Sequence, residues 1–150
     1  MAWKIVYFKD ENGLEPVREF FDQETLPAEK KRLEVRLKYL KMYGLAILGI
    51  HEDVLETLKG KKFEGLYALR FPDSTNNPRV FVGTLVGGVF VLLHAFKELN
   101  RKDYDRALPV ARRRMNLVLE AQKQALEAQQ RKEREQPKIK RAKPKERKRK

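Results

Sequence analysis

Three short apolar blocks in the second half of the chain constrain its fold more than any other feature. They span residues 65–71, 79–86 and 89–96, and each is rich in β-branched or aromatic residues between turn-forming stretches. The last two blocks are separated only by Gly87-Gly88, a pair that tolerates the positive φ angles of a tight hairpin. The sequence therefore predicts an antiparallel meander of three strands.

The first half of the chain predicts one strand and two helices. Residues 3–8 alternate in a strand-like way and end in a turn cluster at residues 9–13. Pro16 suits the first turn of a helix that continues through Phe21, and Pro27 opens a second helix. In the second helix, leucines recur at three- and four-residue steps between charged residues, so one face is core and the other is solvated: Leu33, Leu37 and Leu40.

The remaining elements are a short helix and a carboxy-terminal helix. Residues 44–60 carry the weakest pattern, and within them we expect a helix over residues 52–58. After the meander, Asn100 or Asp103 can cap a last helix, with Pro109 near its start. The apolar stripe of this helix is Leu108, Ala111, Met115 and Val118. The predicted fold class is α+β, with the order β-α-α-β-β-β followed by this helix.

The positive charge of the chain is concentrated in its last twenty residues. Residues 131–150 hold 12 Lys or Arg and 3 Asp or Glu, so they carry +9 of the total +13. Their only large aliphatic residue is Ile139, and Pro137 and Pro144 interrupt them, so we predict a disordered tail. Residues 1–130 are then the folded domain. The tail is either a solubilising segment or an arm that binds nucleic-acid phosphates in a salt-sensitive way.

Composition also limits the compartment and the chemistry. The chain has no cysteine, which excludes disulfides and thiolate metal sites and fits a reducing environment. Lys4 interrupts the first apolar run, so residues 1–10 do not form a signal peptide, and no apolar run is long enough for a transmembrane helix. We expect a cytoplasmic protein without a metal or other cofactor.

Four cationic groups recur inside the predicted meander. They are Arg70, Arg79, His94 and Lys97, set among apolar residues. Charges in such strands are costly unless they are exposed or paired, so their recurrence indicates a shared surface for an anion. Phosphate is the candidate ligand.

The same blocks resemble a known family. Leu69-Arg70, Arg79-Val80-Phe81 and His94-Ala95-Phe96-Lys97, in this order and at these separations, are similar to the second half of RelE/ParE toxins. Within that superfamily the match is closest to the phage-derived HigB-like branch of type II toxin-antitoxin systems. The amino-terminal half of that branch resembles residues 16–21 and 40–44, so the resemblance covers about residues 3–115.

The resemblance implies a small RelE-like domain that cuts mRNA on the ribosome and is silenced by a DNA-binding antitoxin. Two positions depart from the branch. It usually has an acidic residue where this chain has Ala68, and often a second lysine where this chain has Glu98. The first change removes a partner for an arginine, and the second lowers the positive charge beside Lys97.

The four cationic residues fit a metal-independent ribonuclease. RNA is cut when its own 2′-hydroxyl attacks the adjacent phosphate, which requires a base, an acid and fixed positive charge. His94 is the candidate acid or base, Arg70 and Arg79 can hold phosphate oxygens, and Lys97 can neutralise developing charge. The candidate substrate-binding residues are Lys61, Lys62, Tyr67 and Lys102.

Each of these residues also has a structural interpretation. Strand alternation predicts that Phe90, Leu92, His94 and Phe96 share one face, so His94 and Lys97 converge only if the strand bends between them. His94 is alternatively a partly buried core histidine, and Arg70 a structural partner of Glu64 or Glu98. Lys61 and Lys62 are alternatively a solvated loop.

Two functions therefore stay open at this point. One is a toxin that acts as an mRNA endoribonuclease. The other is a non-catalytic protein on the same scaffold, either a ParE-like inhibitor of DNA gyrase or a phage-encoded nucleic-acid-binding protein. His94 and the arginines favour the nuclease, whereas Ala68, Glu98 and the basic tail favour binding.

Overall fold

The chain is described from a computed structural model. It describes the backbone of residues 2–51, 53–58, 60–71, 74 and 76–148, and the side chains of these residues except Lys62 and residues 135–148. By their contacts the residues divide into two units, 1–115 and 116–150.

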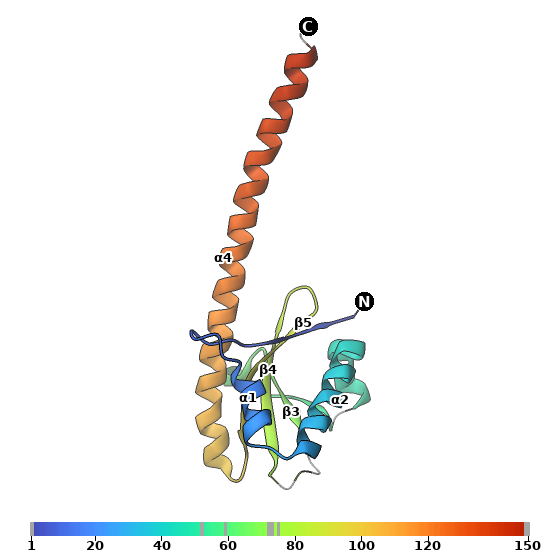
Figure 1. Cartoon of the computed structure of the whole chain (residues 1–150), viewed down its shortest axis with the longest axis vertical. Helices are drawn as coiled ribbons and strands as arrows, with labels where there is room; N and C mark the ends of the chain where they lie inside the picture. Colours follow the sequence, from blue (N-terminus) through green and yellow to red (C-terminus); the bar gives the residue numbers. More distant parts are fainter. Residues whose placement is uncertain (1, 52, 59, 72–73, 75, 149–150) are drawn as a thin grey trace. The chain divides into compact units, whose positions relative to one another are not determined.

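A five-stranded mixed sheet forms the centre of the first unit (Figure 1). The strands lie in the order β1-β5-β4-β3-β2. β1 is parallel to β5, and the other neighbours are antiparallel. Their bounds are β1 Lys4–Tyr7, β2 Leu55–Thr57, β3 Leu66–Arg70, β4 Pro78–Leu85 and β5 Val89–Lys97.

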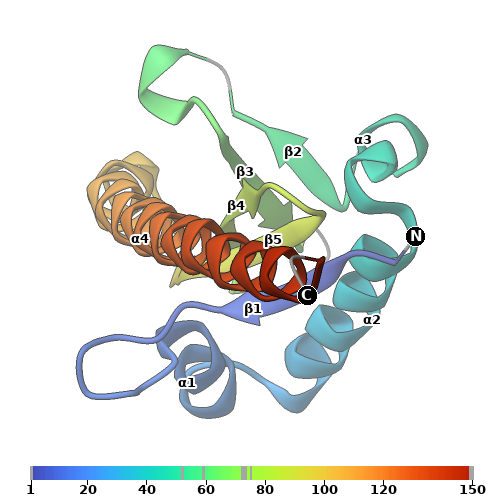
Figure 2. The same cartoon turned by 90° about the horizontal axis from the view of Figure 1, so that it is seen from above.

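Within the described residues, four α-helices accompany the sheet, so the fold class is α+β as predicted. They are α1 (Pro16–Gln23), α2 (Pro27–Tyr43), α3 (Ile47–Ile50) and α4 (Arg101–Lys148). Two 3₁₀ turns, η1 (Gly44–Ala46) and η2 (Lys61–Phe63), complete the chain. Figure 2 shows α3 beside β2, the edge strand opposite β1.

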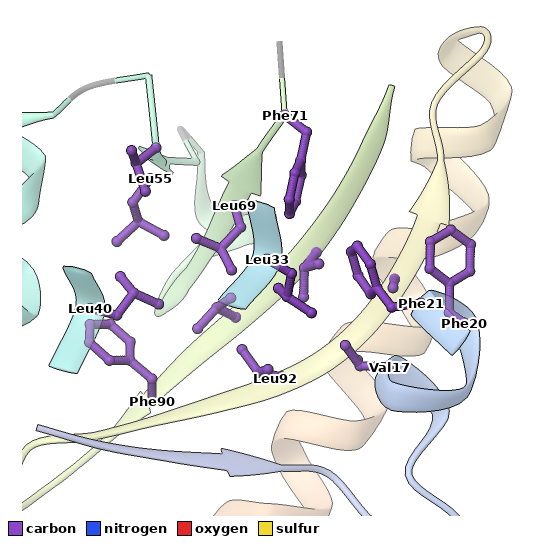
Figure 3. Close-up of a cluster of buried hydrophobic side chains, with 14 of the residues drawn as sticks. Val17, Phe20, Phe21, Leu33, Leu40, Leu55, Leu69, Phe71, Phe90 and Leu92 are labelled. Atoms are coloured by element: carbon purple, nitrogen blue, oxygen red, sulfur yellow. The ribbon is translucent and has the colours of Figure 1, made fainter. Parts of the chain in front are cut away.

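One face of the sheet packs against α1 and α2 and forms the main core. Val17 and Phe21 of α1 and Leu33 and Leu40 of α2 meet apolar side chains of the strands (Figure 3). The strand residues of this core face include Leu55, Leu69, Val80, Val82, Phe90 and Leu92. Their burial is the main favourable term for folding of this unit.

The meander and both long amino-terminal helices are confirmed. The hairpin between β4 and β5 turns at Gly87 and Gly88, whose φ angles of 96° and 77° lie in the region that glycine tolerates. The predicted cap of α4 is also present. Asn100 Oδ1 accepts a hydrogen bond from the Asp103 backbone N–H, and Asp103 Oδ2 accepts one from the Asn100 backbone N–H.

The helix predicted over residues 52–58 is wrong. Leu55–Thr57 instead forms β2, which pairs with β3, while Glu52 lies outside the described residues. Leu55 is buried on the core face and its neighbour Glu56 lies on the other face, which is the alternation of a strand. Three residues are too few for a periodic pattern to be recognised in sequence.

A β-bulge in β5 changes the predicted alternation. Val82 pairs with Leu92 and Phe81 pairs with His94, so Leu93 is an extra residue in β5. Before the bulge, Phe90 and Leu92 lie on the core face. After it, His94 lies opposite Phe81 on the other face, so the prediction that these β5 residues share one face is wrong.

Helix α4 continues through Lys148, whereas the sequence predicted a disordered tail from residue 131. Residues 119–136 are rich in Ala, Leu, Gln, Glu, Lys and Arg, which are strong helix formers. Residues 149 and 150 of the tail lie outside the described residues. Within the part of the chain that the structure describes, no helix is long and apolar enough to cross a bilayer.

Candidate functional site

The face of the sheet opposite the core combines charged and aromatic side chains. Cross-strand pairing places Glu56, Ala68 and Phe81 in one row, and Arg70, Arg79 and Phe96 in the next. Paired residues on neighbouring strands point to the same face. Phe81 and Phe96 contact Tyr104 of α4, so we call this surface the α4 face.

An ion-pair cluster occupies the open edge of the α4 face. Glu56 Oε2 lies 3.2 Å from Arg79 Nη1 and 3.5 Å from Arg70 Nε. Glu98 Oε1 lies 3.0 Å from Arg79 Nε. The structure thus brings together two of the predicted site residues, Arg70 and Arg79, and pairs both with carboxylates.

Although residue 68 is an alanine, Arg70 and Arg79 have an acidic partner in Glu56. Glu56 and Ala68 are directly paired across β2 and β3, so the Glu56 carboxylate extends from the neighbouring strand on the same face. Glu56 thus provides an acidic partner for both arginines although residue 68 is an alanine. The predicted ion pair of Arg70 exists, but its partner is Glu56 rather than Glu64 or Glu98.

The Arg79 side chain lines a cleft with a volume of about 760 Å³. The side chain of Arg79 is mostly buried, and its guanidinium lies 5.9 Å from the centroid of the Tyr104 ring. Phe63 of η2 contacts the same ring, with 5.9 Å between centroids. The residues that carry charge, amide or aromatic groups into the cleft are Glu56, Phe63, Asn77, Arg79, Glu98, Asn100, Arg101 and Tyr104.

Local structure fixes both sides of this cleft. Asn77 has a positive φ of 42°, and its Nδ2 donates to the Glu98 carbonyl while its own carbonyl accepts from the Glu98 N–H. These bonds join the start of β4 to the end of β5. The Asn100 and Asp103 cap starts α4 at the same place and positions Tyr104. Burial and the nearby Glu56 carboxylate raise the pKa of Tyr104, so its hydroxyl stays protonated at neutral pH.

His94 lies on the α4 face but outside the cleft. Its ring stacks on Phe96, with 5.9 Å between centroids, and Phe96 in turn contacts Tyr104. Arg114 Nη1 donates to the Leu93 carbonyl at 2.8 Å and lies 3.3 Å from His94 Nδ1. Because arginine has no acceptor, Nδ1 accepts this contact and the proton of the neutral ring is on Nε2.

Burial, with the Arg114 charge as a second cause, lowers the pKa of His94 to about 4. At pH 7 a histidine with this pKa is protonated in about one molecule in a thousand. General acids and bases work best when their pKa lies near the working pH. The geometry therefore supports a neutral, hydrogen-bonded histidine, and the acid or base role of His94 stays a prediction.

The other predicted residues do not join the arginines. Lys97 follows Ala95 in alternation, and Ala95 belongs to the core face, so Lys97 and His94 lie on opposite faces. Tyr67 also packs against the core. Lys61 in η2 and Lys102 in the first turn of α4 are exposed. Lys61 lies two residues before Phe63, and Lys102 follows Arg101, both of which line the cleft. The side chain of Lys62 lies outside the described residues.

Glu56, Tyr104 and Arg114 were not found from the sequence. Glu56 was hidden because β2 was not recognised. Tyr104 lies between two aspartates and Arg114 ends a run of three arginines, patterns that are typical of a solvated helix face. Among the described residues, no group of three His, Asp or Glu side chains has the arrangement of metal ligands. The chain matches no protein-family model and no curated protein sequence.

Proposed function

We propose that this protein is the toxin of a type II toxin-antitoxin system and cuts mRNA as a metal-independent endoribonuclease. The observation that carries the proposal is the position of Arg79 in the cleft, between carboxylates and beside Tyr104. An arginine fork suits a phosphate, and aromatic rings suit the unstacked bases of single-stranded RNA. The ribosome as the place of action and the DNA-binding antitoxin rest on the RelE/HigB resemblance of residues 3–115.

Each group in the cleft has a role in the proposed reaction. Arg79, supported by Arg70, stabilises the negative charge on the attacked phosphate. Glu56, which contacts both arginines, accepts the proton of the attacking 2′-hydroxyl. Tyr104 and Phe63 stack the neighbouring base. The 2′-oxygen forms its bond to phosphorus as the 5′-oxygen leaves and takes a proton from water, which yields a 2′,3′-cyclic phosphate and a 5′-hydroxyl end.

Cleavage of single-stranded RNA and of ribosome-bound mRNA, both in chelator, tests this proposal. We expect a 2′,3′-cyclic phosphate end, and no cleavage where the nucleotide 5′ of the cut is 2′-deoxy, because the nucleophile is then absent. Arg79→Ala should slow cleavage by about a hundredfold or more through lost phosphate stabilisation. Arg79→Lys should recover part of the rate, since it keeps the charge without the fork. Arg106→Ala, an exposed arginine of α4 outside the cleft, is the control.

A second proposal follows from the charge balance of the site, in which the cationic and anionic side chains cancel. His94 is uncharged at pH 7, and the charges of Arg70 and Arg79 are balanced by Glu56 and Glu98. A non-catalytic protein, either a ParE-like gyrase inhibitor or a nucleic-acid-binding protein, needs no titrating group here. Inducible expression with mapping of RNA 5′ ends separates the two proposals. New ends that disappear with Arg79→Ala support the nuclease, whereas growth arrest without them supports the second function.

A further inference from the structure

The two carboxylates on Arg79 are held differently. Glu56 contacts Arg79 Nη1 and also reaches Arg70 Nε, so it bridges two arginines. Within the described residues, the Glu98 carboxylate pairs with Arg79 alone: its Oε1 lies 3.0 Å from the buried Arg79 Nε without making a hydrogen bond to it. The backbone of Glu98 is fixed by Asn77, so the side chain can rotate away without moving the end of β5. Release of Glu98 thus breaks one ion pair, and release of Glu56 breaks two.

Arg79 needs a counter-ion whether or not the cleft holds a ligand. Its side chain is only 15% exposed, and a largely buried guanidinium without an anion is strongly destabilising. Carboxylate and phosphate oxygens use the same N–H donors of arginine. Either anion can therefore neutralise Arg79, and both cannot lie against its Nε at once.

We propose that Glu98 is a displaceable counter-ion that occupies the position of an RNA phosphate on Arg79. RNA binding exchanges the Glu98 carboxylate for a backbone phosphate, while Glu56 stays and keeps Arg70 and Arg79 aligned. The inference rests on the proposed function, because it takes single-stranded RNA as the ligand of the cleft. It gives a role to Glu98, which stands where the HigB-like branch often has a second lysine.

Binding of a short, fluorescently labelled 2′-O-methyl oligouridine tests this exchange without cleavage. Glu98→Gln should bind the probe on the order of tenfold more tightly than the unmodified protein at low salt, because a competing charge beside the phosphate is gone. Glu64→Gln makes the same change in net charge at an exposed residue outside the ion-pair cluster, and it should stay within about twofold. Glu56→Gln should bind more weakly than Glu98→Gln, since both arginines lose their shared anchor.

Equal gains for Glu98→Gln and Glu64→Gln would overturn the inference, as would the absence of measurable binding by every variant. Circular dichroism of each variant excludes a folding defect as the cause of weak probe binding. Glu98→Ala removes the same carboxylate with a different side chain and should bind the probe as Glu98→Gln does. Cleavage assays of the same protein samples, with unmodified RNA as the substrate, separate this inference from the proposed function. Tighter binding by Glu98→Gln without any cleavage retains the counter-ion and removes the nuclease. Cleavage with unchanged binding by Glu98→Gln retains the nuclease and removes the counter-ion.

Discussion

The core face and the α4 face of the sheet alternate along the same strands but differ in composition. The core face presents the apolar side chains of Leu69, Val80 and Val82 to α1 and α2. The α4 face replaces part of its apolar surface with Arg70, Arg79 and their carboxylates. The α4 face is also buried where Phe81 and Leu93 lie, and its charged groups are gathered at one edge, beside the cleft.

This comparison predicts that the core face and the cleft respond differently to loss of an aromatic ring. Phe21 is 2% exposed and packs against Phe20 and Phe71, so Phe21→Ala should lower the free energy of unfolding by about 3–5 kcal/mol. Phe63 is half-buried at the cleft, and Phe63→Ala should cost about 1.5 kcal/mol or less while weakening RNA binding. Urea unfolding of both variants measures this difference. Equal costs would show that the cleft side also carries the core.

The next effect concerns the one histidine on the α4 face. Because the pKa of His94 is lowered from 6.5 to about 4, the unfolded chain takes up a proton at a higher pH than the folded chain does. Stability from this group is complete above pH 6.5, decreases by about 2–3 kcal/mol as the pH falls towards 4, and does not decrease further below that.

His94→Gln should flatten the pH dependence of unfolding between pH 4 and 6.5. His51→Gln, which changes the only other histidine of the chain, is the control and should leave that dependence in place. Urea unfolding at stepped pH values measures both. The same slope in His94→Gln and in the unmodified protein would mean that the ring is not buried against Phe96 and Arg114.

The two faces also differ in how far the sequence predicts them. Apolar blocks such as Val80-Phe81-Val82, bounded by turn-forming stretches, were enough to predict the strands, and the Gly87-Gly88 turn set the register of the hairpin. The core face follows from these local patterns. The α4 face depends on pairings between distant segments, above all Glu56 with Ala68, and on the extra residue Leu93 that turns His94 away from the core. Neither feature leaves a periodic pattern in sequence.

The smallest expected effect concerns residues 116–148 of α4, whose last part, residues 131–148, the sequence predicts as disordered and the structure shows as helix. Side chains 119–134 are almost all exposed, so this segment has little tertiary burial to stabilise it. A helix that depends on propensity alone is marginal in water, and Pro137 and Pro144 each remove a backbone donor. Amides there should show about tenfold protection or less from hydrogen exchange, and those of β4 and β5 should approach global stability. Strong protection of residues 120–134 in the isolated protein would mean that the segment packs against another surface, and the contrast with the sheet would no longer hold.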